Sequence, residues 1–310
     1  MNQTRPDLSV IIVNWNTRAL LISCIESIHK TVVDLRYEIL VVDNASTDDS
    51  VEVVRNRFPD VRLICNERNL GFAAANNQAF DHMQGRYALL INSDARLLPG
   101  AARALFDHLE THADVGMVCG RLLHPDGTPQ RSVAPFPSWL TLITNETLLN
   151  VLFPRRYPGK RRIPDRPIEV ASAIGACLLI RKTAIDQIGG FDEGYFFFFE
   201  ETDLARRMWE NGWKVVWVPQ ATIVHEQGKS VGNRADGRIL FYRSRYRYLR
   251  KWHPWTYPIL SSLVVLRLIV NFLLSCAGVL LTAGCVKSLR NKTIVYGKLL
   301  AWHLDGSGGS

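Results

Sequence analysis

Short, almost continuous apolar runs alternate with segments of helical periodicity in the first third of the chain. The run Leu8–Val13 is typical of a strand that is buried on both faces. Apolar residues between Leu20 and Ile28 follow at helical spacing, with Asn16 or Thr17 as the expected N-cap. The pattern then repeats as further expected elements: strand Tyr37–Val42, a helix from Asp48 to Phe58, strand Val61–Cys65, helix Gly71–Met83 and strand Arg86–Ile91. This rhythm predicts an α/β fold in which crossover helices join parallel strands.

The rest of the chain is less regular. Prolines recur through Leu123–Ile168, which predicts a long insertion rich in loops. Beyond it, order is expected to return at Val170–Arg181, where an apolar run ends at a charged pair. A loop that enters a helix is expected in Phe191–Trp213, and a strand at Lys214–Val218. The run Ile259–Leu281 is nearly all apolar and is long enough to cross a bilayer as a helix. We therefore expect one α/β domain over residues 1–250, a membrane-associating helical segment over 251–305, and an added glycine–serine linker at 306–310.

The net charge of +8 is unevenly distributed, and this limits what it implies. Basic residues gather around 155–166, 243–251 and 287–298, whereas the first third is nearly balanced, which argues against a nucleic-acid binder. Both flanks of Ile259–Leu281 are basic and Arg267 lies within it. Since basic flanks favour the cytoplasmic side, an in-plane, monotopic or peripheral arrangement at the cytoplasmic face is expected. A soluble helical hairpin buried in an oligomer remains the alternative.

The six cysteines show no C-x-x-C pair and no zinc-like spacing. Most lie in apolar runs, which favours buried free thiols and a reducing compartment.

Polar residues follow four successive predicted strands. Asn14-Trp15-Asn16, Asp43–Asp48, Asn66–Phe72 and Asn92-Ser93-Asp94 come directly after them. Such residues also favour ordinary turns, so one strand end alone would be ambiguous. Because the carboxyl ends of parallel strands meet at one edge, four in succession favour a ligand-binding edge.

The chemistry of this edge points to a metal-bridged diphosphate. No G-x-G-x-x-G or G-x-x-x-x-G-K-[ST] pattern is present, which disfavours dinucleotide oxidoreductases and P-loop enzymes. A diphosphate bound near carboxylates needs a divalent cation, Mg²⁺ or Mn²⁺, held by hard oxygen ligands. Asp94 is the candidate ligand, with a cap before Leu97 as the alternative.

Two later clusters carry further candidates. Glu200, Glu201 and Asp203 follow an aromatic run and open a helix. The helix dipole favours carboxylates there, but an aromatic wall would also desolvate a general base and raise its pKa. His225 follows a short apolar run, where a lone histidine is more often structural than a ligand.

Together these residues resemble glycosyltransferase family 2, with the GT-A fold, and most closely its rhamnosyltransferase-like branch. The similarity covers residues 8 to about 250, in family order. It rests on these stretches: Val10–Asn16, Val41–Ser50, Asn69–Asn77, Asn92–Ala95, Gly175–Lys182, Gly189–Arg207 and Val224–Ser230.

The resemblance implies roles for the residues of the strand edge. Asp43 would read the base of a nucleotide-sugar donor, and Asn92-Ser93-Asp94 would stand for the family's D-x-D metal motif. The first position of that motif is Asn here, so Asp94 would be the main carboxylate ligand, with His225 as a second metal ligand. The other implied contacts to the nucleotide sugar come from Val13, Asn14, Asn16, Ser46, Asn69, Gly71, Asn76, Asn92 and Ser93.

The resemblance also implies the reaction. Glu201 would be the catalytic base in a direct displacement with inversion, with Glu200 and Asp203 as substitutes, since Asp is more usual than Glu at position 201. The implied donor is dTDP-L-rhamnose, and the implied acceptor is a lipid-linked glycan such as a polyprenyl diphosphate sugar. Rival interpretations are a family member with a UDP-linked donor, an inactive nucleotide-sugar-binding or scaffold protein of this fold, and a sugar nucleotidyltransferase.

Overall fold

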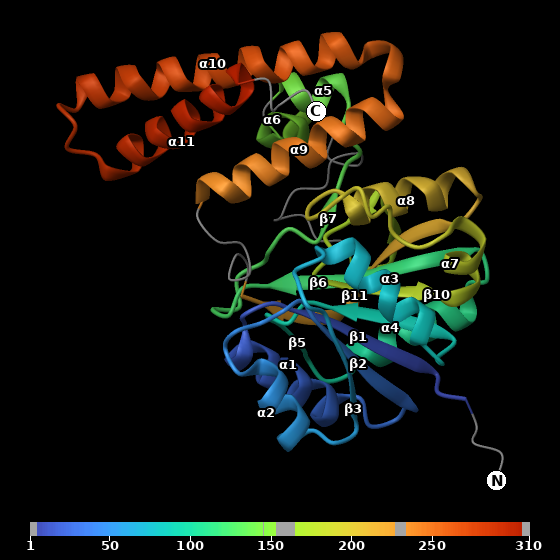
Figure 1. Cartoon of the computed structure of the whole chain (residues 1–310). Coiled ribbons are helices and arrows are strands. Elements are labelled where there is room, and N and C mark those ends of the chain that lie inside the picture. The colour runs from blue at the N-terminus through green and yellow to red at the C-terminus, as the bar shows by residue number, and fades with distance from the viewer. Residues whose placement is uncertain (1–4, 145, 153–164, 227–233, 306–310) are drawn as a thin grey trace. The chain divides into compact units, whose positions relative to one another are not determined.

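The computed structural model describes residues 5–144, 146–152, 165–226 and 234–305 (Figure 1). The chain divides into two compact units. The first, here called the sheet unit, comprises Met1–Phe136, Phe153–Phe196 and Glu200–Ser230. The second, the helical unit, comprises Pro137–Leu152, Phe197–Phe199 and Val231–Ser310.

The division differs from the one expected after residue 250, which falls inside helix α9 (Arg234–Trp252). Packing explains the difference. Tyr246 and Leu249 of α9 share a small apolar core with Leu260 and Val264 of helix α10, so α9 belongs with the helices that follow it.

A large mixed sheet forms the centre of the sheet unit. Its strand order is β3-β2-β1-β4-β10-β6-β11-β5, with β8 paired to β11. The strands are β1 (Leu8–Asn14), β2 (Tyr37–Asp43), β3 (Val61–Cys65), β4 (Tyr87–Ile91), β5 (Ala95–Leu97), β6 (Val115–Leu123), β8 (Ile168–Glu169), β10 (Cys177–Arg181) and β11 (Lys214–His225). A separate pair joins β7 (Val133–Ala134) to β9 (Ser172–Ala173).

Most strands of the large sheet share one direction. β1, β2, β3 and β4 run parallel, and β6 and β11 run the same way. β10 lies antiparallel between β4 and β6, and β5 and β8 are antiparallel to β11. The expected α/β architecture, a mostly parallel sheet flanked by helices, is therefore confirmed.

Helices cover both faces of the sheet, as the alternation of buried side chains requires. Val10 and Ile12 of β1 face the core shared with α1, α2 and α4, whereas Ile11 faces the core shared with α3, α7 and α8. These helices are α1 (Arg18–Thr31), α2 (Ser50–Arg57), α3 (Phe72–His82), α4 (Ala101–Thr111), α7 (Lys182–Ile188) and α8 (Glu200–Glu210).

The expected capping residues act differently from the prediction. Thr17 occupies the N-cap position of α1, but its side chain makes no capping bond. The carboxylate of Asp48 accepts from the amide of Arg18 at 2.8 Å and from that of Ser50 at 3.3 Å. One side chain therefore serves the first turns of both α1 and α2.

The helical unit contains α5 (Trp139–Ile143), α6 (Glu146–Leu152), α9, a 3₁₀ turn η1 (Pro254–Thr256), α10 (Tyr257–Leu281) and α11 (Lys287–Leu304). The expected loop-rich insertion is thus partly helical, while residues 153–164 lie outside the described residues. In the described part of the chain, one helix, Pro254–Leu281, is long and apolar enough to cross a membrane.

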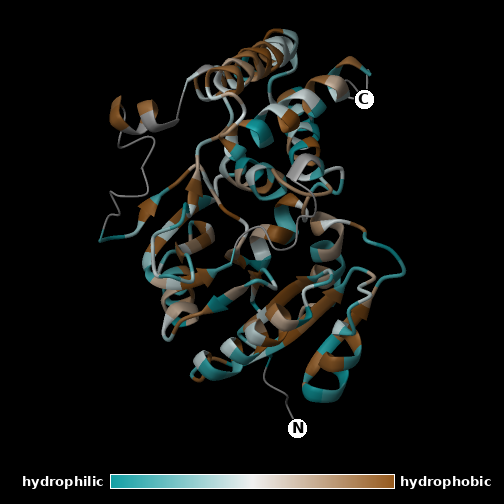
Figure 2. Ribbon diagram, turned by 90° about the vertical axis from the view of Figure 1, so that its left-hand side faces the viewer, coloured by the Kyte–Doolittle hydropathy of each residue, from teal (hydrophilic) through white to brown (hydrophobic). Residues whose placement is uncertain are grey.

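The ribbon of α10 is largely hydrophobic (Figure 2), and its apolar side chains are divided between buried and exposed positions. Leu260, Val264 and Leu268 are buried, whereas Leu273 is 60% and Leu274 66% exposed. The single charged residue of the run is exposed but has partners: the Nη1 atom of Arg267 donates to the carbonyls of Leu142 (2.6 Å) and Thr144 (3.4 Å), at the C-terminal end of α5. A cation at a helix C-terminus is stabilised there, so the charge of Arg267 is partly offset where it meets the exposed apolar face.

Candidate functional site

The ends of β1 and β2 are joined by buried polar side chains. Asn14 and Asp43 are partners in the parallel pairing of these strands. The amide nitrogen of Asn14 donates to Asp43 Oδ1 at 2.8 Å and to Ser46 Oγ at 3.0 Å. The other Asp43 oxygen accepts from the amide of Ser46 at 2.8 Å. The two strand ends that sequence singled out are therefore brought together and fixed by their own hydrogen bonds.

The loops that follow are cross-linked in the same way. Asn16 and Ala45 adopt left-handed backbone conformations, with φ of 53° and 60°. The Asn16 side chain accepts from the amide of Thr47 at 2.7 Å, and Ser46 Oγ accepts from the amide of Asn16 at 2.9 Å. Asn tolerates this conformation better than most residues, so Asn16 has a backbone reason for its place before any ligand is considered.

Thr17 connects this pair of loops to the fourth strand end. Its hydroxyl donates to Asn14 Oδ1 at 2.7 Å and lies 2.7 Å from Ser93 Oγ. Since the Thr17 hydrogen is used on Asn14, Ser93 is the donor in the second bond. The sequence around Thr17 predicts only a helix cap. Nothing local to it indicates a bond to Ser93, which lies 76 positions later.

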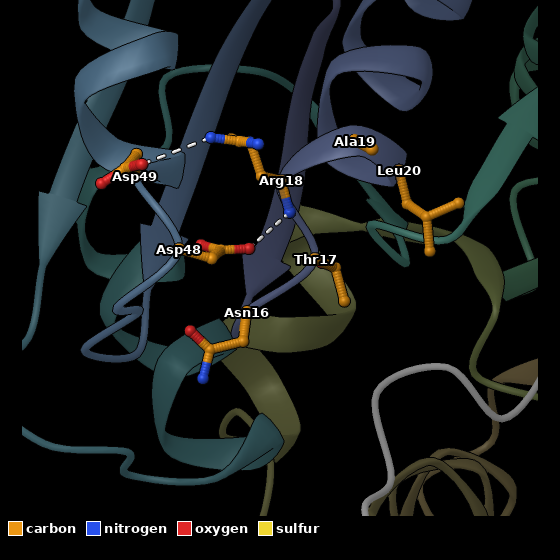
Figure 3. Close-up of a pocket in the computed structure, with 7 residues that line it drawn as sticks. All are labelled: Asn16, Thr17, Arg18, Ala19, Leu20, Asp48 and Asp49. Carbon is orange, nitrogen blue, oxygen red and sulfur yellow. Dashed lines mark hydrogen bonds and ion pairs between the residues drawn. The ribbon is translucent and has the colours of Figure 1, made fainter.

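A surface hollow of about 490 Å³ lies beside these loops, at the first turn of α1 (Figure 3). Its lining residues are Asn16, Thr17, Arg18, Ala19, Leu20, Asp48 and Asp49. Arg18 closes one side through an ion pair with Asp49 at 3.3 Å. The hollow borders the strand edge at Asn16 and Thr17, but neither Asp94 nor the carboxylates of α8 line it.

Asn69, Gly71 and Asn76 shape the turn into α3. Asn69 Oδ1 accepts from the amide of Gly71 at 2.9 Å, and Asn76 Nδ2 donates to the carbonyl of Phe72 at 2.8 Å. Gly71 has φ of +86°, and a Cβ at this position would lie 2.5 Å from the carbonyl oxygen of Phe196. Only glycine meets both conditions, so this position is set by the fold before any ligand is considered.

Asp94 and His225 face each other at the edge of the sheet. β5 pairs with β11 so that Ala95 lies opposite His225, which brings His225 Nε2 to 3.2 Å from Asp94 Oδ1. Both residues are buried, at 4% and 7% exposure. Asp94 Oδ1 and Asn92 Oδ1 are buried oxygens that accept no hydrogen bond from the described residues. Buried oxygens of this kind are normally satisfied, so the pair has unused capacity for a ligand.

The pair fits a hard divalent cation. In an octahedral site with ligands at about 2.1 Å, two adjacent ligands lie about 3 Å apart, close to the observed 3.2 Å. Among the described residues no group of three His, Cys, Asp or Glu side chains could hold a metal. The protein would thus supply two ligands and leave the remaining positions for phosphate oxygens and water, as is usual for Mg²⁺ sites.

The three carboxylates at the start of α8 have different surroundings. Asp203 is fully buried and forms an ion pair with Arg207 at 2.9 Å. Arg207 also donates to the carbonyls of Ile188 (3.0 Å) and Gly190 (2.7 Å). This network ties α8 to the loop after α7, so Asp203 has a structural task that occupies its carboxylate.

Among the described residues, neither Glu200 nor Glu201 forms an ion pair of this kind. Burial raises the pKa of Glu201 to about 7, against the opposing effect of the backbone amides of Glu201 and Thr202. Burial also raises the pKa of Glu200 well above its ordinary value, and the charge of Glu201 adds to this effect. Glu200 Oε2 is buried and has no hydrogen-bond partner in the part of the chain that the structure describes. The side chain of Glu201 passes Gly175, whose absent Cβ would lie 3.7 Å from Glu201 Cγ.

Two further predicted features, the aromatic run before Glu200 and the motif after His225, lie partly outside the sheet unit or outside the described residues. Phe197, Phe198 and Phe199 belong to the helical unit, where Phe198 and Phe199 pack against Phe241 of α9. Residues 227–230 of the late motif lie outside the described residues. The sequence does not predict a role at this site for three residues: Thr17, Asn44 and Gln130. Asn44 supports the turn before α3, because its side chain donates to the carbonyl of Gly71 at 3.1 Å.

The chain is similar to known glycosyltransferases in sequence. Residues 9–189 match the model of Glycosyl transferase family 2. The chain is 32% identical over 241 residues to the N-acetylglucosaminyl-diphospho-decaprenol L-rhamnosyltransferase of Mycobacterium tuberculosis (strain ATCC 25618 / H37Rv). That alignment covers 71% of this chain and 78% of the relative.

Solved structures agree on the fold. GalNAc-T7 with UDP, GalNAc and Mn²⁺ superposes with a TM-score of 0.59 at 16% identity, over 81% of this chain and 49% of that one. The mannosyltransferase PcManGT of Pyrobaculum calidifontis, in complex with GDP-Man and Mn²⁺, gives 0.56 at 19% identity, over 97% and 87%. The expected GT-A-like architecture is confirmed by this likeness.

The raised pKa of Glu201 predicts a pH dependence of stability. The folded chain retains a proton on this carboxyl up to pH of about 7, whereas the unfolded chain releases it near its ordinary value of 4.5. Because the folded state binds more protons in that window, the free energy of unfolding should fall as pH rises from 4.5 to 7. The variant Glu201→Gln should lose less stability than the wild type over this range in denaturant titrations at pH 5, 6 and 8.

Glu210→Gln, at the exposed end of the same helix, is the matched control and should follow the wild type. If the free energy of unfolding changes with pH in the same way for wild type and Glu201→Gln, Glu201 is not the titrating group.

Proposed function

The chain belongs to glycosyltransferase family 2, and we propose that it transfers L-rhamnose from dTDP-L-rhamnose to a polyprenyl-diphosphate-linked glycan, with inversion and with a divalent cation. That it is a glycosyltransferase follows from the family. The finer proposal of donor and acceptor is supported by the decaprenol-linked L-rhamnosyltransferase that it resembles. The observation that carries the proposed mechanism is the buried Asp94–His225 pair, whose Asp94 Oδ1 accepts no hydrogen bond from the described residues.

The donor would lie along the strand edge. Asp43, held by Asn14 and Ser46, would read the base, while Val13 and Asn16 frame the nucleoside. Asn69, Gly71 and Asn76 would follow the ribose and diphosphate. Asn92 and Ser93 directly precede Asp94, the proposed metal ligand. Since Asn14, Asp43 and Ser46 are already fixed by mutual bonds, little ordering would be needed when the donor binds.

Glu201 would take the proton of the acceptor hydroxyl as that oxygen attacks the anomeric carbon. A pKa of about 7 is close to that of an efficient general base at neutral pH. Direct attack from the face opposite the leaving group gives inversion. Asp94 and His225 would hold Mg²⁺ or Mn²⁺, which would offset the charge on the departing nucleoside diphosphate. Glu200, buried beside Glu201, raises the cost of ionising both carboxyls together.

The helical unit would hold the enzyme at the cytoplasmic face of the membrane without crossing it. The exposed side of α10 is mostly apolar, and its one exposed cation, Arg267, donates to a carbonyl of α5. Exposed Lys287, Arg290 and Lys292 of α11 would meet anionic lipid. An enzyme placed there could reach a lipid-linked acceptor for cell-surface polysaccharide synthesis.

Replacing Asp94 tests the metal assignment. Asp94→Ala should lower transfer by about 10²–10⁴-fold, because the leaving diphosphate loses its charge stabilisation. Its thermal unfolding should stay cooperative. Nucleoside diphosphate release from dTDP-L-rhamnose, measured across a Mn²⁺ titration, gives the rate. Exposed Asp81→Ala is the control and should match the wild type. Near-normal turnover of Asp94→Ala with an unchanged metal response would rule out the assignment.

The membrane proposal predicts an effect of charge on α10. Replacing Leu273 and Leu274 by Glu should greatly reduce flotation of the full chain with vesicles containing phosphatidylglycerol, since two exposed apolar side chains are lost from the lipid face. Val33→Glu, at an 80% exposed position of the sheet unit, should float like the wild type. Equal flotation of all three proteins would contradict a lipid face on α10.

Topology can be read separately from Cys285, an exposed thiol between α10 and α11. An impermeant maleimide should label it only after cells are lysed, with Cys285→Ser as the control. Labelling of Cys285 in intact cells would mean that α10 spans the bilayer.

A further inference from the structure

Gln130 is a buried polar residue, 6% exposed, that no part of the proposed mechanism uses. It follows a tight turn after β6, in which the carboxylate of Asp126 accepts from the amide of Thr128 at 2.9 Å and Gly127 has φ of +80°. The amide of Gln130 then donates to the carbonyl of Leu122 at 2.8 Å. The turn therefore holds Gln130 against the end of β6, next to the strand that carries His225.

The orientation of the Gln130 amide follows from its partners. One of its terminal atoms lies 2.5 Å from the backbone carbonyl oxygen of His225, which can only accept, so that atom must be the nitrogen Nε2. The second hydrogen on Nε2 is directed to Nδ1 of His124 at 2.8 Å. Both donors of the amide are used, and the oxygen Oε1 is left facing the His225 ring.

This orientation determines where His225 carries its proton. Gln130 Oε1 lies 3.1 Å from His225 Nδ1. An amide oxygen only accepts, so Nδ1 must bear a hydrogen. A neutral imidazole with a hydrogen on Nδ1 has its lone pair on Nε2, the atom that lies 3.2 Å from Asp94 Oδ1.

We propose that Gln130 is a positioning residue that keeps Nδ1 of His225 protonated and presents the Nε2 lone pair, together with Asp94 Oδ1, to a divalent cation. The inference rests on the proposed metal site and adds the residue that prepares it. Because Gln130 is buried and makes all three bonds at once, it fixes the rotation of the ring as well as its tautomer. Partners of this kind typically raise metal affinity by about 10–100-fold.

The tautomer can be measured directly in the wild-type protein. Long-range ¹H–¹⁵N correlation on ¹⁵N-histidine-labelled protein, at pH 8 without added metal, distinguishes a protonated from an unprotonated ring nitrogen. The His225 signals are identified by their loss in His225→Gln. A hydrogen on Nδ1 of His225 is the expected result. An unprotonated Nδ1 would overturn the proposal.

Metal affinity provides the second measurement. Free Mn²⁺ detected by electron paramagnetic resonance, with and without dTDP, should show binding about 10–100-fold weaker in Gln130→Met than in the wild type. Gln130→Asn, whose shorter side chain cannot reach the ring, should behave similarly and serves if the Met variant does not fold. Gln220→Met makes the same chemical change at an exposed position on β11 and should bind like the wild type.

Asp94→Ala distinguishes a failure of the proposed metal site from a failure of the role proposed for Gln130. If it loses Mn²⁺ while a folded Gln130→Met binds normally, the metal site stands and the role of Gln130 is wrong. If Asp94→Ala also binds Mn²⁺ normally, the proposed metal site itself fails, and this inference fails with it.

Discussion

A carboxylate oxygen buried without a hydrogen-bond donor is costly, and the site is organised around one. Asp94 Oδ1 accepts no hydrogen bond from the described residues, and His225 Nε2 lies 3.2 Å from it. Elsewhere along the strand edge the polar side chains satisfy one another, as Asn14 does with Asp43 and Ser46. At this edge, the buried oxygens that accept no hydrogen bond from the described residues are Asp94 Oδ1 and Asn92 Oδ1. Buried charges are tolerated when they are paired or bind metals, and this arrangement fits the second case.

The carboxylates of α8 show how burial and partners assign different tasks to adjacent residues. Asp203 is neutralised by Arg207, which also ties the helix to the loop after α7. Glu200 and Glu201 form no ion pair with a described cation, and burial raises the pKa of each. A carboxyl that is half-ionised near neutral pH can accept a proton during transfer, whereas one held by arginine cannot do so without breaking that pair. Glu201 therefore fits the proposed role of base better than Asp203 does.

The sequence was informative wherever local pattern determines structure. The alternation of apolar runs and helical segments predicted β1 to β4 with their helices, and the rule that parallel strands end at one edge placed Asn14, Asp43 and Asp94 near a common site. It was less informative where distant segments meet. The antiparallel insertion of β10, the bond from Thr17 to Ser93 and the reach of Arg267 to the end of α5 depend on contacts between residues far apart in the chain. Gln130 is the clearest case, because its partner His225 lies 95 positions later.

A crystal structure of the full chain with dTDP and Mn²⁺ would show directly whether Asp94 and His225 hold the metal, since anomalous scattering locates Mn²⁺ independently of any assumed role. An anomalous peak is expected beside Asp94 Oδ1 and His225 Nε2, with the diphosphate next to the metal and the base beside Asp43. A nucleotide bound at the strand edge with Mn²⁺ coordinated elsewhere, for example by Glu200 and Glu201, would contradict this expectation.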